Sequence, residues 1–265
     1  MIQMQISERR STAPEGRRGG AILLVICGAV CLGLVFLAVA LLAACSASVS
    51  SAIRADGSAT MSIQADVTEA VAAKLRKLGT AAGGTGQTAP FFDQGAIRTS
   101  IAARPYLSLN ELSSPSLDSL RLSVDVRSLR ELAEAPDVKG SGLVVLTKGP
   151  SWTEYRFRLD RGDIKTLRAL LPGIDPALMD ALAPPAFDTD PVTAADYRTM
   201  LRSLFGEKAM PSIDAAAVTL AVSVPGTILD SGGGSLSGST LTAKIPMLQI
   251  LVLERPVEVW VRWAN

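Results

Sequence analysis

Histidine is absent from all 265 residues of the sequence. Its absence excludes every Ser–His or Cys–His catalytic arrangement. It also removes the commonest general base and the commonest metal ligand. Carboxylate pairs and Ser–Lys dyads remain open to such a chain. The candidate lysines for a dyad, Lys139 and Lys148, each precede a glycine in a turn pattern, whereas a lysine that acts as a base needs an apolar setting. We therefore expect a protein that is not an enzyme, with no catalytic residues, no metal site and no cofactor.

Cysteine and excess charge are also scarce beyond the N-terminal region. The three cysteines are Cys27, Cys31 and Cys45, so the chain after position 45 has neither a disulfide nor a free thiol. Of the 26 basic and 25 acidic residues, four arginines and two glutamates precede Cys45, which leaves 22 and 23. A chain without a basic excess is not expected to bind nucleic acid.

What the N-terminal region does contain is one long apolar run, from Ala21 to Cys45, preceded by two arginines. Its last four residues look like the lipobox of a bacterial lipoprotein signal: Leu42, Ala43, Ala44 and Cys45. Basic residues hold such a segment on the cytoplasmic side, and small side chains give a peptidase access to the backbone. This resemblance implies lipid attachment to the thiol of Cys45 and cleavage before it.

The predicted domain organisation follows from this signal. Residues 1–44 are expected to be a signal peptide, with a polar lead over 1–20 and an apolar core over 21–44, and residues 45–265 to be one extracytoplasmic domain. The expected location is the cell membrane, with a lipid anchor as the membrane partner and the domain facing the periplasm or the cell exterior. An uncleaved transmembrane helix is the alternative, because the apolar core is long enough to span ~30 Å of hydrocarbon.

Beyond Cys45 the hydrophobic pattern alternates between strand and helix periods. Period-two alternation predicts strands over 59–65, 120–126, 153–159 and 257–263, with turn signals such as Asp56-Gly57 between segments. A proline-broken section, 163–206, has the helical period, which is clearest over 194–205. The pattern contains no repeated βαβ units. We therefore predict the α+β class, with an antiparallel sheet built from hairpins and helices packed on one face.

Three segments outside the signal carry a family resemblance. Residues 53–59 read IRADGSA, an extended strand with an Asp-Gly turn, and residues 222–233 read VSVPGTILDSGG. After the glycine-rich turn, residues 241–246 read LTAKIP. Taken together, these segments resemble the LppM-like lipoproteins, a family of bacterial membrane-anchored domains. The resemblance implies an α+β envelope domain similar to lipid-binding proteins, and it brings no catalytic residues to this chain.

Two functions remain open at this stage. The first is a noncatalytic envelope lipoprotein that binds an apolar or amphipathic, lipid-like ligand in a cleft. The candidate lining residues, which would otherwise be ordinary core, are Phe91, Phe92, Met200, Phe205 and Trp260. The alternative is an interaction or assembly module that docks an envelope protein partner through Trp260 and the charged strand faces. The charged face of residues 154–160 is itself expected to be solvated.

Overall fold

The structure is a computed structural model that describes residues 46–81, 90–135, 139, 143–163 and 192–265. The predicted signal peptide and Cys45 lie outside the described residues, as does most of the predicted helical section, residues 164–191. In the described part, strands form a seven-stranded and a four-stranded sheet, with helices packed around them. The predicted α+β class is confirmed, and the strands divide between two sheets.

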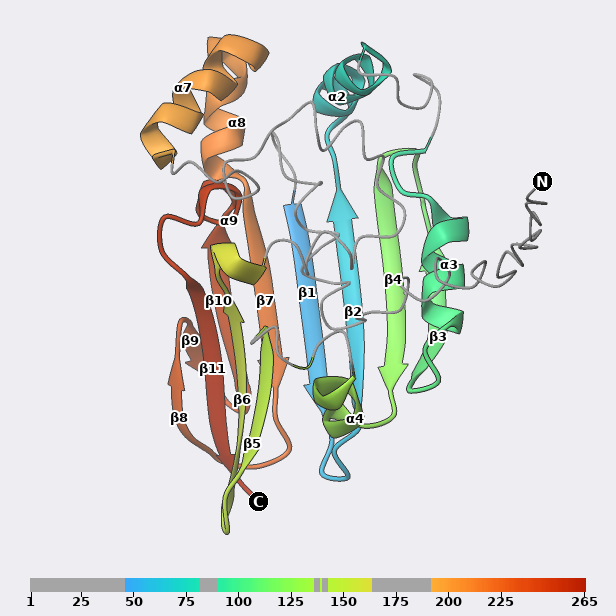
Figure 1. Ribbon diagram of the computed structural model, residues 1–265, viewed down its shortest axis with the longest axis vertical. Helices are drawn as coiled ribbons and strands as arrows, with labels where there is room; N and C mark the ends of the chain where they lie inside the picture. Colours follow the sequence, from blue (N-terminus) through green and yellow to red (C-terminus); the bar gives the residue numbers. More distant parts are fainter. Residues whose placement is uncertain (1–45, 82–89, 136–138, 140–142, 164–191) are drawn as a thin grey trace, which may run out of the picture.

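The larger sheet has the strand order β3-β4-β2-β1-β7-β10-β9 (Figure 1). Its strands are β1 (Ser46–Ile53), β2 (Ala59–Asp66), β3 (Leu107–Ser113), β4 (Ser119–Val126), β7 (Ala217–Ser223), β9 (Ser235–Ser237) and β10 (Thr240–Pro246). β1 is a central strand, antiparallel to β2 and parallel to β7. The parallel pair departs from the all-antiparallel sheet that the hairpin pattern predicts.

The smaller sheet has the order β5-β6-β11-β8 and is antiparallel throughout. Its strands are β5 (Val144–Lys148), β6 (Trp152–Leu159), β8 (Ile228–Gly232) and β11 (Val257–Ala264). Alternate residues of β6 and β11 point inward, among them Phe157 and Val261, and they join the inward residues of the larger sheet in one core. The period-two patterns of the sequence therefore place their apolar residues between the two sheets.

Helices cover the ends and one edge of the sheets. They are α2 (Glu69–Ala81), α3 (Gln94–Ala102), α4 (Leu129–Glu134), α7 (Ala194–Phe205), α8 (Met210–Ala215) and α9 (Met247–Val252), with short 3₁₀ turns η1 (Arg161–Asp163) and η3 (Glu207–Ala209). Local signals set several helix starts, because the side chains of Asp93, Ser128 and Thr193 each accept a hydrogen bond from a backbone N–H in the first turn. Across the described residues, none of these helices combines the length and apolar character needed to cross a membrane.

The two ends of the larger sheet differ in what surrounds them. At the end where β1 begins, α2 follows β2, α8 precedes β7 and α9 follows β10, with α7 packed beside α8 (Figure 1). At the opposite end lie α4, the turn between β1 and β2, and the turn between β7 and β8. The helix-rich end adjoins Ser46, and the turn-rich end contains the cavity described below.

Candidate functional site

A cavity of about 940 Å³ lies at the turn-rich end, and elements of both sheets line it. Its walls come from the β1–β2 turn, α4, the facing hairpin strands β5 and β6, the β7–β8 turn and the end of β11. A volume of this size is in the range of small-molecule sites in proteins, about 300–1,000 Å³. The cavity is therefore large enough to enclose part of an organic ligand.

The inner wall of the cavity is apolar. It includes Ile53, Leu129 and Trp263, which are 7%, 3% and 5% exposed. Backbone hydrogen bonds hold this wall in place, since Leu129 N donates to the Gly57 carbonyl at 2.9 Å. Gly226 approaches the end of β11 so closely that a Cβ there would lie 2.1 Å from the Ala264 carbonyl oxygen. The turns are thus fixed against the sheet ends, and the cavity is a preformed feature of the fold.

The rim of the cavity carries basic side chains. Arg130 and Lys148 are exposed, and neither makes a hydrogen bond or ion pair with its side chain in the part of the chain that the structure describes. Arg54 is engaged elsewhere, since its guanidinium binds Thr60 and lies 3.4 Å from a carboxylate oxygen of Asp125 on the outer face of the larger sheet. The site therefore combines an apolar wall with two cations that form no ion pair within the described residues, and the carboxylates of Asp56 and Glu134 also line it.

The five residues predicted to line a cleft do not come together. Phe91 and Phe92 are buried in the core with their rings edge to face, 5.3 Å between centroids, and Phe205 is buried where α7 ends. Met200 is 37% exposed on α7, and Trp260 lies on the outer face of the smaller sheet. None of the five lines the cavity. Their role in ligand binding stays a prediction. The sequence pattern did not single out Leu129 or Trp263, which do line the cavity.

Sequence reasoning also missed the cavity as a whole, although one signal for it was present. The turn dipeptides Asp56-Gly57 and Pro225-Gly226 end strands that lie side by side in space, so both turns fall at the same end of the sheets. This spatial coincidence depends on the pairing of β1 with β7, which strand patterns alone do not reveal.

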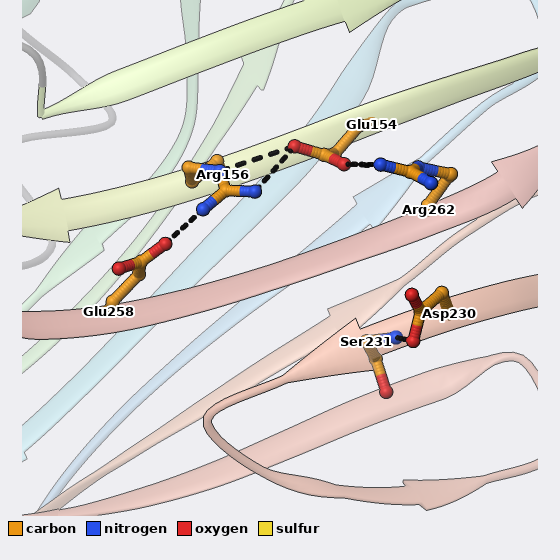
Figure 2. A network of polar contacts seen from close by, with 6 residues as sticks. All are labelled: Glu154, Arg156, Asp230, Ser231, Glu258 and Arg262. Carbon is orange, nitrogen blue, oxygen red and sulfur yellow. Dashed lines mark hydrogen bonds and ion pairs between the residues drawn. The ribbon is translucent and has the colours of Figure 1, made fainter.

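The outer face of the smaller sheet carries a second arrangement, an ion-pair network (Figure 2). Glu154 of β6 accepts two hydrogen bonds from Arg156 on one oxygen, at 3.0 and 3.2 Å, and two from Arg262 of β11 on the other, at 2.7 and 3.1 Å. Arg156 also binds Glu258. The strand register explains the network, because Trp260 pairs with Arg156 and Arg262 pairs with Glu154 across β6 and β11.

Two tryptophans complete this face. The Arg262 guanidinium lies 4.6 Å from the ring centroid of Trp152, and the Arg156 guanidinium lies 5.3 Å from that of Trp260, within the range of cation–π contacts. The Trp260 indole covers Gly232, where a Cβ would lie 2.3 Å from Nε1. We call the group formed by Trp152, Glu154, Arg156, Trp260 and Arg262 the Trp–Arg ladder.

The ladder differs in one respect from the solvated face that the sequence predicts. The side chain of Glu154 is only 8% exposed, whereas the two arginines bound to it are 36% exposed. Burial raises the pKa of a carboxyl group, but the hydrogen bonds from Arg262 and Arg156 outweigh this effect and hold the pKa of Glu154 below its ordinary value. The carboxylate is thus a charged, fully bonded centre of the ladder.

Neither arrangement resembles a metal centre or an acid–base pair. Within the described ranges, no group of three or more Asp, Glu, Cys or His side chains is placed to hold a metal ion. The predicted lipid site at Cys45 and the lipobox residues Leu42, Ala43 and Ala44 lie outside the described residues, and the first described residue is Ser46.

Comparison with known proteins gives one similar structure. No protein-family model matches the chain, and no curated protein matches it. The folded domain of LppM from Mycobacterium tuberculosis, solved by NMR, is similar with a TM-score of 0.41 and 11% sequence identity, over 84% of this chain and 91% of that chain. A similarity of this degree identifies no function, so the proposals below rest on the sequence and on the geometry of the site.

Proposed function

We propose that this chain is a noncatalytic envelope lipoprotein that binds an anionic amphipathic ligand, such as a fatty acid or phospholipid. Cys45 carries the lipid anchor, and the cavity at the turn-rich end receives the ligand. The observation that carries the proposal is this cavity, in which an apolar wall lies next to two exposed cations. The absence of histidine and of thiols beyond Cys45 supports a binding role over a catalytic one.

The chemistry of the lining supports this ligand class. Ile53, Leu129 and Trp263 offer contact to an acyl chain or another apolar body, because burying such a ligand removes apolar surface from water. Arg130 and Lys148 at the rim suit a carboxylate or phosphate headgroup, since a cation without a protein partner is available to a ligand anion. An amphiphile with its headgroup at the rim satisfies both surfaces.

Mass spectrometry tests the anchor. We expect the protein isolated from its own membrane to begin at Cys45 and to carry acyl chains, and we expect a Cys45→Ala variant to keep its signal segment and to carry none. A matched Cys31→Ala variant removes a thiol from the apolar core and should be processed normally. A mass that includes residues 1–44 in all three proteins would favour the uncleaved transmembrane helix.

A charge-reversal series tests the cavity. The purified protein is titrated with a fluorescent fatty-acid probe, and lipids that copurify with it are extracted and weighed by mass spectrometry. We expect the Arg130→Glu, Lys148→Glu double variant to bind the probe at least about tenfold more weakly, as the loss of one charge-assisted contact predicts. Arg98→Glu, Lys244→Glu is the control, because it makes the same change in charge at two exposed residues that do not line the cavity. Equal binding by both variants would contradict a headgroup site at this rim.

The Trp–Arg ladder supports a second candidate function, docking of an envelope protein partner. Tryptophan and arginine dominate the energetic centres of protein interfaces, and here Glu154 binds both arginines of the ladder. A photoreactive phenylalanine analogue in place of Trp260 is expected to give one discrete crosslinked product in cells. The same analogue at Leu236, exposed on β9, is the control. The absence of any product specific to position 260 would count against this function.

A further inference from the structure

The helix-rich end of the molecule has an exposed apolar surface that neither the cavity nor the ladder uses. On α7, Met200 is 37% and Leu204 is 45% exposed. The two residues are four positions apart and therefore lie on one face of the helix. The adjoining face of α7 is buried through Tyr197, Leu201 and Phe205. The exposed pair thus forms a short apolar ridge beside the buried face of the helix.

The two hydroxyl groups on the exposed side of α7 form hydrogen bonds with the backbone of the helix. The Thr199 hydroxyl donates to the Ala195 carbonyl at 3.0 Å, and the Ser203 hydroxyl donates to the Thr199 carbonyl at 3.2 Å. A hydroxyl that is already hydrogen-bonded to the helix backbone loses less when it leaves water. This face of α7 can therefore move into a less polar medium at a small cost.

Both arginines of α7 bind neighbouring segments. Arg198 makes two hydrogen bonds with Asp214 of α8, at 2.6 and 2.7 Å, and Arg202 lies 2.9 Å from a carboxylate oxygen of Glu207. These pairs neutralise the arginines beside the ridge and fix α7 against α8 and the following turn. The carboxylate of Asp196, one turn before Met200, accepts a hydrogen bond from the Thr193 hydroxyl at 2.7 Å and lies at the N-terminal end of the ridge.

Two exposed lysines lie at this end of the molecule. Lys77 of α2 and Lys208 of η3 are exposed and make no side-chain hydrogen bond or ion pair with any residue that the structure describes. α2 is held next to the end of α7, because Lys74 Nζ donates to the Phe205 carbonyl at 2.5 Å. An apolar ridge flanked by lysines is complementary to the interface of a bilayer that contains anionic lipids.

The position of this end relative to the anchor makes the bilayer the fitting occupant. β1 begins at Ser46, the residue that follows Cys45, and at that point it pairs with Ala217, just after α8. Figure 1 shows α7 beside α8 at this same end. A lipid on Cys45 therefore leaves no intervening linker, and the helix-rich end lies nearest the membrane.

We propose that α7 lies on the surface of the bilayer that holds the lipid of Cys45, with Met200 and Leu204 at the boundary between headgroups and acyl chains. Lys77 and Lys208 contact anionic headgroups. This placement rests on the lipid anchor of the proposed function. It also sets the orientation of the cavity, because the eight residues of β1 separate the two ends by about 25 Å at ~3.3 Å per residue. The cavity then opens toward the aqueous side, away from the anchoring bilayer.

Spin labelling of the full chain tests this placement. Met200→Cys and Leu204→Cys variants are made with Cys27→Ala and Cys31→Ala in the background, so that the nitroxide reacts only at the new thiol of the lipidated protein. The protein is reconstituted in vesicles of phosphatidylcholine and phosphatidylglycerol. Leu229→Cys is the matched control, because Leu229 is 56% exposed on β8, next to the strand position that pairs with Trp263 at the cavity.

Collision with a water-soluble nickel chelate and with oxygen is then measured at each label. We expect nickel collisions at positions 200 and 204 to fall about fivefold or more below those at position 229, with a rise in oxygen collisions, as at an acyl–headgroup boundary. Equal nickel access at all three positions, on protein that withstands an alkaline carbonate wash, would overturn the placement of α7 and leave the anchor intact. Protein that washes off the vesicles would overturn both.

Discussion

Replacing Glu154 with glutamine removes one negative charge from the centre of the Trp–Arg ladder and keeps the size of the side chain. The glutamate accepts four hydrogen bonds from two guanidinium groups, at 2.7 to 3.2 Å. In the variant, one oxygen becomes an NH₂ group, which cannot accept from an arginine. Arg156 or Arg262 therefore loses its pair of bonds, and the remaining charge at the site is positive.

The expected magnitude follows from burial. Breaking a buried ion pair costs about 3–5 kcal/mol, and exposed pairs contribute about 0–1 kcal/mol. Here the carboxylate is 8% exposed while both arginines are 36% exposed, which places the interaction between these limits. We expect the free energy of unfolding to fall by about 2 kcal/mol, and the melting temperature of a domain of this size to fall by about 4–8 °C.

Urea unfolding, followed by tryptophan fluorescence, measures this change. Asp160→Asn is the control, because Asp160 and Arg158 form an ion pair on the same strand with side chains 41% and 51% exposed, for which we expect a loss of about 0.5 kcal/mol or less. A double-mutant cycle with Arg262→Gln isolates the coupling between the two partners. If Glu154→Gln costs no more than Asp160→Asn, the ladder contributes no special stability and our reasoning on burial is refuted.

The Glu154→Gln variant should also differ from the wild type in how its free energy of unfolding depends on pH. The pKa of Glu154 in the folded protein lies below its ordinary value of 4.5, so its contribution to stability is fully present above pH ~4.5 and is lost as the pH falls through the folded pKa. The difference in unfolding free energy between the wild type and Glu154→Gln should therefore be constant from neutral pH to about 5 and shrink below 4.5. A difference that grows in acid would contradict the assigned sign.

Three further substitutions test other parts of the structure. Gly226→Ala should lower the unfolding free energy by about 2 kcal/mol, measured by urea unfolding, because its Cβ would meet the Ala264 carbonyl; an unchanged midpoint would mean that the turn relaxes freely. Phe92→Ala, at a position 1% exposed, should cost about 3–4 kcal/mol and Met200→Ala less than 1 kcal/mol, and similar costs would contradict the burial assigned to them. Thr193→Ala should remove the N-cap of α7 and lower the free energy of unfolding by about 1 kcal/mol. Amide hydrogen exchange at the start of α7 should become faster, and an unchanged exchange rate would contradict the role of the cap.

Local patterns predicted those elements whose signals lie within one segment. The helix over 194–205 has the predicted bounds, because its period, its cap and the positive φ of Gly206 (83°) are all local. Other described elements, among them β3 and α9, had no such signal. β3 contains a register shift between Leu109 and Glu111, which breaks its alternation, and α9 is too short for a helical period to be recognised.

The arrangement of the elements could not be predicted, because it depends on strand pairings for which no single segment contains a pattern. The parallel pairing of β1 with β7, and the separation of the strands into two sheets, arise from contacts between distant parts of the chain. The cavity depends on the same contacts, since its walls are turns brought together by them. The burial of Glu154 could not be predicted from the sequence either. Its side chain is on the outward face of the strand, and the arginines that cover it come from two strands.

The central position of β1 has a consequence for how the protein is made. β1 is synthesised first, but its parallel neighbour β7 begins only at Ala217, which follows about 10–30 s later at typical rates of synthesis. During that interval β1 can pair with β2 while its other edge remains open, and an open edge is prone to pair with other chains. The sheet therefore closes only after most of the chain has emerged, and folding of the nascent protein is expected to be slow and to benefit from a chaperone.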